Sequence, residues 1–317
     1  MKSVLCGLAL LLASLPAAGQ YPTKPVRMLV GFTPGGGVDI MARLVAARLT
    51  ERWGKAVVVE NRAGAAGNIA TELVSKSAPD GHTLLMAFSS HASNAALYPS
   101  LPFDIARDFA SITLVATAPV VVIATPAAPA KTLAELIDYA RAHPGAIKFA
   151  SSGVGTPVHL AGELMMQLTG TRLTHVPYKG IAPAMTAMLG GETDITYAAV
   201  LSANQHIRSG RLRALALASG RRYPGLQDVP TAAEAGLPGF EIDYWYALLG
   251  PAGLPAGVIQ QVQRDTSGVV NAPETKASLL EQGSIAVGGT PEQLDAIIRR
   301  DYALWVKVVK AGGVKPE

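Results

Sequence analysis

Three glycine-rich turns are the parts of this sequence best suited to chemistry, because each can present bare backbone to a ligand. They lie at 34–37 (Pro-Gly-Gly-Gly), 63–67 (Ala-Gly-Ala-Ala-Gly) and 151–157 (Ser-Ser-Gly-Val-Gly-Thr-Pro). Glycine lets ligand atoms approach the main chain, and the first N–H groups of a following helix are unpaired donors at its partially positive end. Such turns suit an anion. At any single turn, a conformational need for glycine is the alternative interpretation.

Polar side chains accompany these turns. Ser90 follows an apolar run, Thr156 is expected to cap a helix that begins at Pro157, and His159 lies early in that helix. Two readings stay open for His159, a ligand contact or a packed, capping histidine. Asp39 likewise could meet a ligand amine or cap the helix that follows the first turn.

The sequence lacks the common signatures of nucleotide-binding and hydrolytic sites. It contains no Gly-x-x-x-x-Gly-Lys-[Ser/Thr], no Gly-x-Gly-x-x-Gly and no Gly-x-Ser-x-Gly segment. Its six histidines show no metal-ligand spacing. We therefore expect no catalytic residues, no metal and no cofactor. An enzyme on the same architecture is the alternative from a different class.

The N-terminus has the pattern of a secretory signal peptide. Lys2 precedes an apolar run from 4 to 15, and small residues lead to a cleavage site after Gly19. The run is shorter than the roughly 20 residues that span a bilayer, so a membrane anchor is the weaker alternative. We expect a periplasmic protein that does not span the membrane, and the only cysteine, Cys6, lies within the segment that is removed.

Composition limits the partners. Removing 19 of 317 residues leaves 298, enough for two lobes, and the loss of Lys2 lowers the formal net charge from +4 to +3. The pI near 9.1 is mildly basic, but no dense Lys/Arg block alternates with aromatic residues, so we expect no nucleic-acid partner.

Apolar periodicity predicts strands that alternate with helices around a mostly parallel sheet. A first set has strands near 26–32, 56–60 and 83–88 and helices near 38–53 and 68–77. A second set has strands near 147–150, 173–177 and 194–198, with helices from about 157 and 182. Apolar strands over 112–124 and a strand over 212–218 connect the two sets, and a largely helical tail is expected to follow. All three glycine-rich turns fall at predicted carboxyl ends of strands, where open α/β sheets place ligands.

Several collinear segments together resemble the Bug family, the extracytoplasmic solute-binding receptors of tripartite tricarboxylate transporters. The resemblance runs from about Tyr21 to the C-terminus and includes a closing helix near Trp305. The segments are Pro34–Arg43, Glu60–Asn68, Ala78–Thr83, Ser151–His159, His175–Gly180 and Asp228–Gly236.

This resemblance implies a type II periplasmic-binding-protein fold, with two α/β lobes joined by two crossing strands and a ligand cleft between them. We expect lobe 1 at 20–124 and 221–317 and lobe 2 at 125–220. The expected ligand is a small carboxylated anion: a di- or tricarboxylate, an acidic amino acid or an aromatic acid. The candidate ligand-binding residues are Phe32, Gly35, Gly36, Ala65, Gly67, Ser90, Ser152, Gly155, Thr156, His159 and Ala199.

The resemblance also implies partners. The lobes are expected to close on the ligand, and the protein, as a monomer, to deliver it to the permease subunits of a tripartite tricarboxylate transporter. A sensor that signals through a receptor kinase is the alternative role. After Asp194 the segment Tyr197–Leu201 departs from commoner relatives, as does Thr33; these departures leave the identity of the ligand open.

Overall fold

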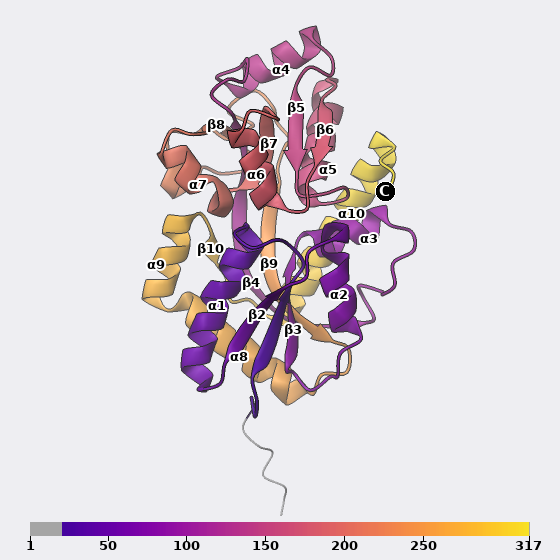
Figure 1. Cartoon of the computed structure of the whole chain (residues 1–317), viewed down its shortest axis with the longest axis vertical. Helices are drawn as coiled ribbons and strands as arrows, with labels where there is room; N and C mark the ends of the chain where they lie inside the picture. The colour runs from indigo at the N-terminus through magenta and orange to yellow at the C-terminus, as the bar shows by residue number, and fades with distance from the viewer. Residues whose placement is uncertain (1–20, 317) are drawn as a thin grey trace, which may run out of the picture.

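The computed structural model describes residues 21–316, which fold into two α/β lobes arranged along the long axis of the molecule (Figure 1). The N-terminal part of the chain, in indigo, forms much of the lower lobe, and the middle of the chain, in magenta and red, forms the upper one. The predicted signal peptide, 1–19, lies outside the described residues.

Lobe 1, the lower lobe, is built on a sheet that begins with three parallel strands. The sheet contains β2 (Val57–Asn61), β1 (Val26–Val30), β3 (Thr83–Phe88), β9 (Asp243–Pro251) and β4 (Phe109–Ala124), in that order. Four of the five residues of β1 are buried, as expected for a strand covered on both faces. The helices that pack on these strands include α1 (Gly37–Trp53), α2 (Asn68–Ser75) and α8 (Ala256–Asn271).

Lobe 2 continues the same sheet beyond β4. Its strands are β7 (Ile195–Ala199), β5 (Lys148–Ser151), β6 (Thr174–Pro177) and β8 (Arg213–Leu217). Its helices are α4 (Leu133–Ala142), α5 (Pro157–Thr169), α6 (Ile181–Leu189) and α7 (Val200–Arg208). The side chains of Thr132 and Thr156 cap α4 and α5, and the helix start predicted at Pro157 is thereby confirmed.

One long strand links the lobes. β4 pairs with β9 from Phe109 to Pro119 and then with β7 and β8 from Val120 to Ala124. The sequence predicted several apolar strands over 112–124; the structure makes them one continuous strand, in which every residue from Ile112 to Ala124 except Thr117 is buried.

The prediction for the segment after residue 218 was partly wrong. A helical tail was expected, but β9 lies in the centre of the sheet and runs antiparallel to both β3 and β4. The aromatic run Tyr244, Trp245 and Tyr246 favours a strand, and all three side chains are buried. The sheet is therefore mixed rather than mostly parallel.

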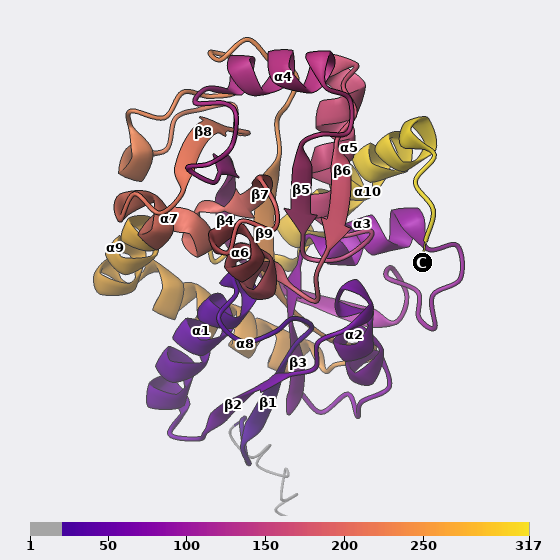
Figure 2. The same ribbon diagram turned by 45° about the horizontal axis from the view of Figure 1, so that its top comes forward.

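The C-terminal part is otherwise helical. It contains α9 (Pro273–Gln282), the short β10 (Ile285–Ala286) and α10 (Pro291–Gly312), which begins with a Thr290–Gln293 capping box. In both views α10, in yellow, lies beside α3 (Ser90–Leu97) and α5 (Figures 1 and 2). The side-chain amide of Gln167 on α5 donates to the carbonyl of Val308 at 2.9 Å, so α10 holds a helix of lobe 2.

Candidate functional site

Two adjoining cavities lie between the lobes. The inner cavity is lined by Phe32, Gly36, Gly37, Val38, Phe88, Ser152, Val158, Ile181, Ala199, Ser202, Tyr244 and Tyr246. The outer cavity is lined by Gly31, Phe32, Gly64, Ala65, Ala66, Gly67, Tyr98, Ser152, Gly153, Val154, Pro177, Tyr178 and Lys179. The volume open to solvent molecules is about 30 Å³ in the inner cavity and about 290 Å³ in the outer one. Phe32 and Ser152 line both cavities, which are therefore parts of one cleft.

The first glycine-rich turn brings the start of α1 against lobe 2. A Cβ atom on Gly36 would lie 3.1 Å from Cγ2 of Ile181, and a Cβ on Gly37 would lie 2.8 Å from Oγ of Ser202. Of the three glycines in this turn, only Gly35 has a positive φ, at 82°. At Gly36 and Gly37 glycine therefore serves close approach between the lobes rather than an unusual backbone conformation.

Three helix N-termini meet at the inner cavity. α1 begins at Gly37 in lobe 1, while α6 begins at Ile181 and α7 at Val200 in lobe 2. Each start carries unpaired N–H groups and a partial positive charge. Among residues 21–316, no acidic or basic side chain lines the inner cavity. The partial positive charge at these helix ends is that of the backbone, which is suited to holding an anion.

Hydroxyl groups add donors to this cavity. Oγ of Ser152 is buried and has no hydrogen-bond partner among the described residues. The hydroxyls of Ser202 and Tyr246 likewise make no hydrogen bond within 21–316, and a Cβ on Gly37 would lie 2.6 Å from the Tyr246 hydroxyl. Burial raises the pKa of Tyr246, so its phenol keeps its proton and remains a donor.

The second glycine-rich turn forms a wall of the outer cavity. Ala65 and Ala66 have φ of 45° and 53°, an uncommon left-handed conformation for alanine. The side-chain amide of Asn94 fixes this turn by donating to the carbonyl of Ala66 at 3.0 Å. Gly67 lies beside Phe32, and a Cβ on Gly67 would lie 3.6 Å from Oγ of Ser90. Ser90 is thus placed behind the turn, on the lobe 1 side.

Several candidate residues use their polar groups within the protein. The N–H of Gly35 donates to Oδ2 of Asp39 at 2.9 Å, and the N–H of Gly67 donates to the carbonyl of Gly64 at 3.0 Å. The hydroxyl of Thr156 donates to the carbonyl of Gly153 at 2.7 Å while it caps α5. These groups fix the shapes of the loops around the cleft.

Gly155 and His159 are joined in the same way. The N–H of Gly155 donates to Nδ1 of His159 at 3.2 Å, and the His159 ring stacks on His175 with centroids 3.9 Å apart. Nε2 of His159 lies 3.5 Å from Oε1 of Glu163. Burial and the neighbouring His159 lower the pKa of His175 to about 3, so this ring is neutral near pH 7. The structure places His159 behind the loop, where it lines neither cavity.

Asp39 also faces away from the cleft. Besides the Gly35 N–H, it binds Arg43 and the side-chain amide of Asn61. Although burial opposes the shift, the hydrogen bonds from Arg43, Gly35 and Asn61 lower the pKa of Asp39. The expected cap of α1 is therefore wrong in detail: no side chain caps the first N–H groups of this helix, and Asp39 instead fixes the turn that precedes it through the Gly35 N–H.

The sequence did not point to several residues that line the inner cavity. Tyr244 and Tyr246 on β9 both line it, whereas Trp245 between them bonds to Asp301 on the other side through its indole nitrogen at 2.8 Å. This alternation is the signal that could have identified them. Phe88, at the end of β3, packs against both tyrosine rings.

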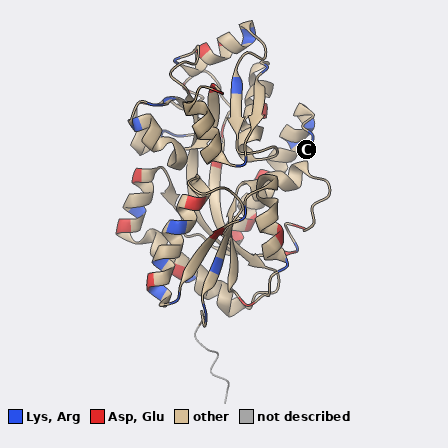
Figure 3. Cartoon of the chain, in the orientation of Figure 1, with Lys and Arg blue, Asp and Glu red and all other residues tan. Residues whose placement is uncertain are grey.

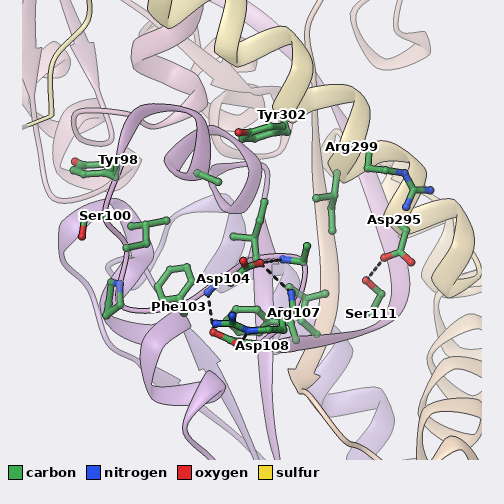
Figure 4. A pocket seen from close by; sticks show the side chains of 18 of the residues that line it. Tyr98, Ser100, Phe103, Asp104, Arg107, Asp108, Ser111, Asp295, Arg299 and Tyr302 are labelled. Atoms are coloured by element: carbon green, nitrogen blue, oxygen red, sulfur yellow. Dashed lines mark hydrogen bonds and ion pairs between the residues drawn. The ribbon is translucent and has the colours of Figure 1, made fainter.

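A larger groove lies outside the cleft. It has a volume of about 900 Å³ and separates the 98–109 loop from α10 (Figure 4). Its polar groups are largely engaged: Oγ of Ser111 donates to Asp295 at 2.6 Å, and Oδ1 of Asp104 accepts from two backbone N–H groups. Its walls carry both acidic and basic side chains, among them Asp104, Arg107, Asp295 and Arg299, and residues of both signs are scattered over both lobes (Figure 3).

Comparison with known proteins identifies the family. A family model described as the tripartite tricarboxylate transporter family receptor matches residues 41–314. The chain belongs to this family. BugT of Bordetella pertussis, a relative by sequence, is 36% identical over 306 residues, which cover 96% of this chain and 94% of BugT. The resemblance to Bug proteins is thereby confirmed.

Solved structures of family proteins have the same fold. R. palustris Rpa4515 with adipate has a TM-score of 0.91 at 34% identity, covering 94% of this chain and 100% of that chain. MatC from Rhodopseudomonas palustris with bound malate has a TM-score of 0.87 at 30% identity, covering 91% and 100%. The two-lobed binding-protein fold is confirmed, and the chain is a periplasmic solute-binding receptor of this family.

Within 21–316, each helix is too short or too polar to cross a bilayer. The same part of the chain contains no group of three or more His, Cys, Asp or Glu side chains placed to hold a metal ion.

Proposed function

We propose that this receptor captures a small carboxylate between its lobes and delivers it to a tripartite tricarboxylate-type permease. The N-termini of α1, α6 and α7 support this proposal, because they meet around a cavity without charged side chains. The unpaired hydroxyl of Ser152 lies beside them. A carboxylate placed there would accept hydrogen bonds from both lobes.

The candidate residues divide into two roles in this proposal. Phe32, Gly36, Ser152 and Ala199 contact the ligand from the inner cavity, and Ala65 and Gly67 contact it from the outer one. Five others hold the loops in shape: Gly35, Ser90, Gly155, Thr156 and His159. Ser202 and Tyr246 join the first group, because their hydroxyls face the same cavity.

Capture proceeds by closure in this proposal. The lobes, at 20–124 with 221–317 and at 125–220, rotate about crossings near 116–125 and 212–222. Only contacts made to both lobes favour the closed state. The fully buried hydroxyl of Ser93 in lobe 1 already donates to the carbonyl of Gly155 in lobe 2 at 2.7 Å.

The ligands of two structural neighbours support the chemistry. Rpa4515 is described with adipate and MatC with malate, both carboxylates. We extend carboxylate binding to this chain because it has an anion site built from backbone. Export with cleavage after Gly19, a monomeric state and a permease as the acceptor complete the proposal.

Thermal unfolding against a panel of carboxylates tests this function. A ligand at 100 times its dissociation constant stabilises the protein by about 2.7 kcal/mol, which raises the midpoint by several degrees. Ser152→Ala should reduce the shift, and Ser100→Ala, at an exposed loop position, should leave it unchanged. No shift with any carboxylate, after mass spectrometry has shown that no ligand co-purifies, would refute the proposal.

A further inference from the structure

The cleft contains a single charged side chain, and it lies at the outer end. Of the described residues that line the inner and outer cavities, only Lys179 is acidic or basic. Lys179 is exposed, between β6 and α6 of lobe 2. It forms no ion pair and no hydrogen bond through its ammonium group within residues 21–316.

Among the described residues, no carboxylate group pairs with the ammonium group of Lys179. The opposite wall of the outer cavity is the 64–67 turn, which consists of glycine and alanine. The adjacent Tyr178 donates its hydroxyl to Glu192 at 3.4 Å, and no ion pair joins Glu192 to Lys179. An unpaired ammonium group at the edge of a cleft that closes is therefore available to an anion on the ligand.

The two cavities share part of their lining. Ser152 and Phe32 line both, so the backbone anion site and the space beside Lys179 adjoin at these two side chains. The inner end supplies N–H and hydroxyl donors without formal charge, whereas the outer end supplies one full positive charge.

We propose that Lys179 selects ligands with two anionic groups, one carboxylate at the inner helix N-termini and the second beside the Lys179 ammonium group. This inference rests on the proposed function, since it assumes that the first carboxylate binds at the inner cavity. A monocarboxylate fills only the inner position and leaves Lys179 without a partner. Lys179 is thus a specificity residue.

Matched ligand pairs isolate this contribution. Adipate and hexanoate differ by one carboxylate in place of a methyl group, and so do malate and 2-hydroxybutyrate. Dissociation constants from isothermal titration calorimetry would be compared for the mature protein, Lys179→Met, Lys179→Arg and Lys131→Met. Lys131 is an exposed lysine of lobe 2 just before α4, and it lines neither cavity.

We expect the wild type to prefer the dianion of at least one pair. A charge-assisted contact that is partly shielded from water is worth about tenfold in affinity, so Lys179→Met should weaken dianion binding roughly tenfold while monoanion binding stays within about twofold. Lys179→Arg should keep the preference, and Lys131→Met should change neither value.

Three results would overturn the inference. The first is wild-type protein that binds only monocarboxylates, and the second is a Lys179→Met variant that keeps the preference for the dianion. The third is a Lys179→Met variant whose affinity falls equally for both members of a pair, which would indicate general attraction of anions. In each case carboxylate binding itself would persist and the proposed function would stand. Failure of every mono- and dicarboxylate to bind would refute both.

Discussion

The hydrogen bond from Ser93 to Gly155 allows the proposed closure of the lobes to be tested. Ser93 lies on α3 in lobe 1, and its Oγ donates to a carbonyl of lobe 2 at 2.7 Å. Its nearest acceptor within lobe 1, the carbonyl of Ser90, is 3.5 Å away and makes at most a weak bond. Ser93→Ala should therefore weaken the closed state and leave each lobe intact.

The size of the effect follows from burial. A hydrogen bond contributes about 1 kcal/mol net, and a buried acceptor left without a donor costs up to about 3 kcal/mol. These values correspond to a dissociation constant raised roughly 5- to 150-fold for the carboxylate that gives the largest thermal shift. The midpoint of ligand-free protein should change by less than about 2 °C.

Titration calorimetry and thermal unfolding of the same samples provide the test. Ser75→Ala is the matched control, because Oγ of Ser75 donates to the carbonyl of Glu72 at 2.9 Å within lobe 1. That variant should lose a little stability and keep its affinity. If Ser93→Ala lowers the ligand-free midpoint by several degrees but binds as tightly as wild type, the bond stabilises the fold and not the closed state.

Two further predictions concern the inner cavity and acid stability. Tyr246→Phe removes a hydroxyl that faces the cavity, and it should weaken carboxylate binding about 3- to 10-fold with little loss of stability. Tyr244→Phe removes the 2.9 Å hydrogen bond to the carbonyl of Tyr197, and it should lower the free energy of unfolding by about 1 kcal/mol. The opposite pattern, in binding measured by calorimetry and stability measured by urea unfolding, would contradict the assignment. Hydrogen bonding to Arg27 lowers the pKa of Glu60 to about 2, below the roughly 4.3 of an unfolded glutamate, so its contribution to stability is complete above about pH 5 and lost as the pH falls toward 2. Unfolding free energies measured between pH 6 and 2.5 should fall less steeply for Glu60→Gln than for wild type, and identical slopes would show that the ion pair contributes nothing.

The alternating elements of the fold could be predicted because each carries a local signal. The strand at 26–30 and the helix that ends at Trp53 follow from apolar periodicity and from Gly54, which closes the helix with φ of 63°. β9 was missed because its neighbours in the sheet, β3 and β4, are more than 100 residues away in sequence. Its central position depends on long-range pairing, which periodicity does not report.

The candidate site could likewise be predicted only in part, because its contacts join segments far apart in the sequence. Glycine at 36 and 37 was recognisable as functional, but the reason for it, contact with Ile181 and Ser202 of lobe 2, depends on how the lobes meet. Sequence also cannot tell a free N–H from one that is already used. The N–H groups of Gly35 and Gly155 looked equally available, yet each donates to a side chain of its own lobe.

The continuity of β4 has a consequence for dissecting this protein. Pro119, which has no N–H, is the last partner of β9, and from Val120 onward the strand lies between β7 and β8. Excising 125–220 would strip residues 120–124 of hydrogen-bonding partners on both sides and leave an exposed apolar edge prone to aggregation. Lobe 2 therefore depends on residues 120–124 to complete its sheet, and chimaeras should exchange lobe 2 together with these residues.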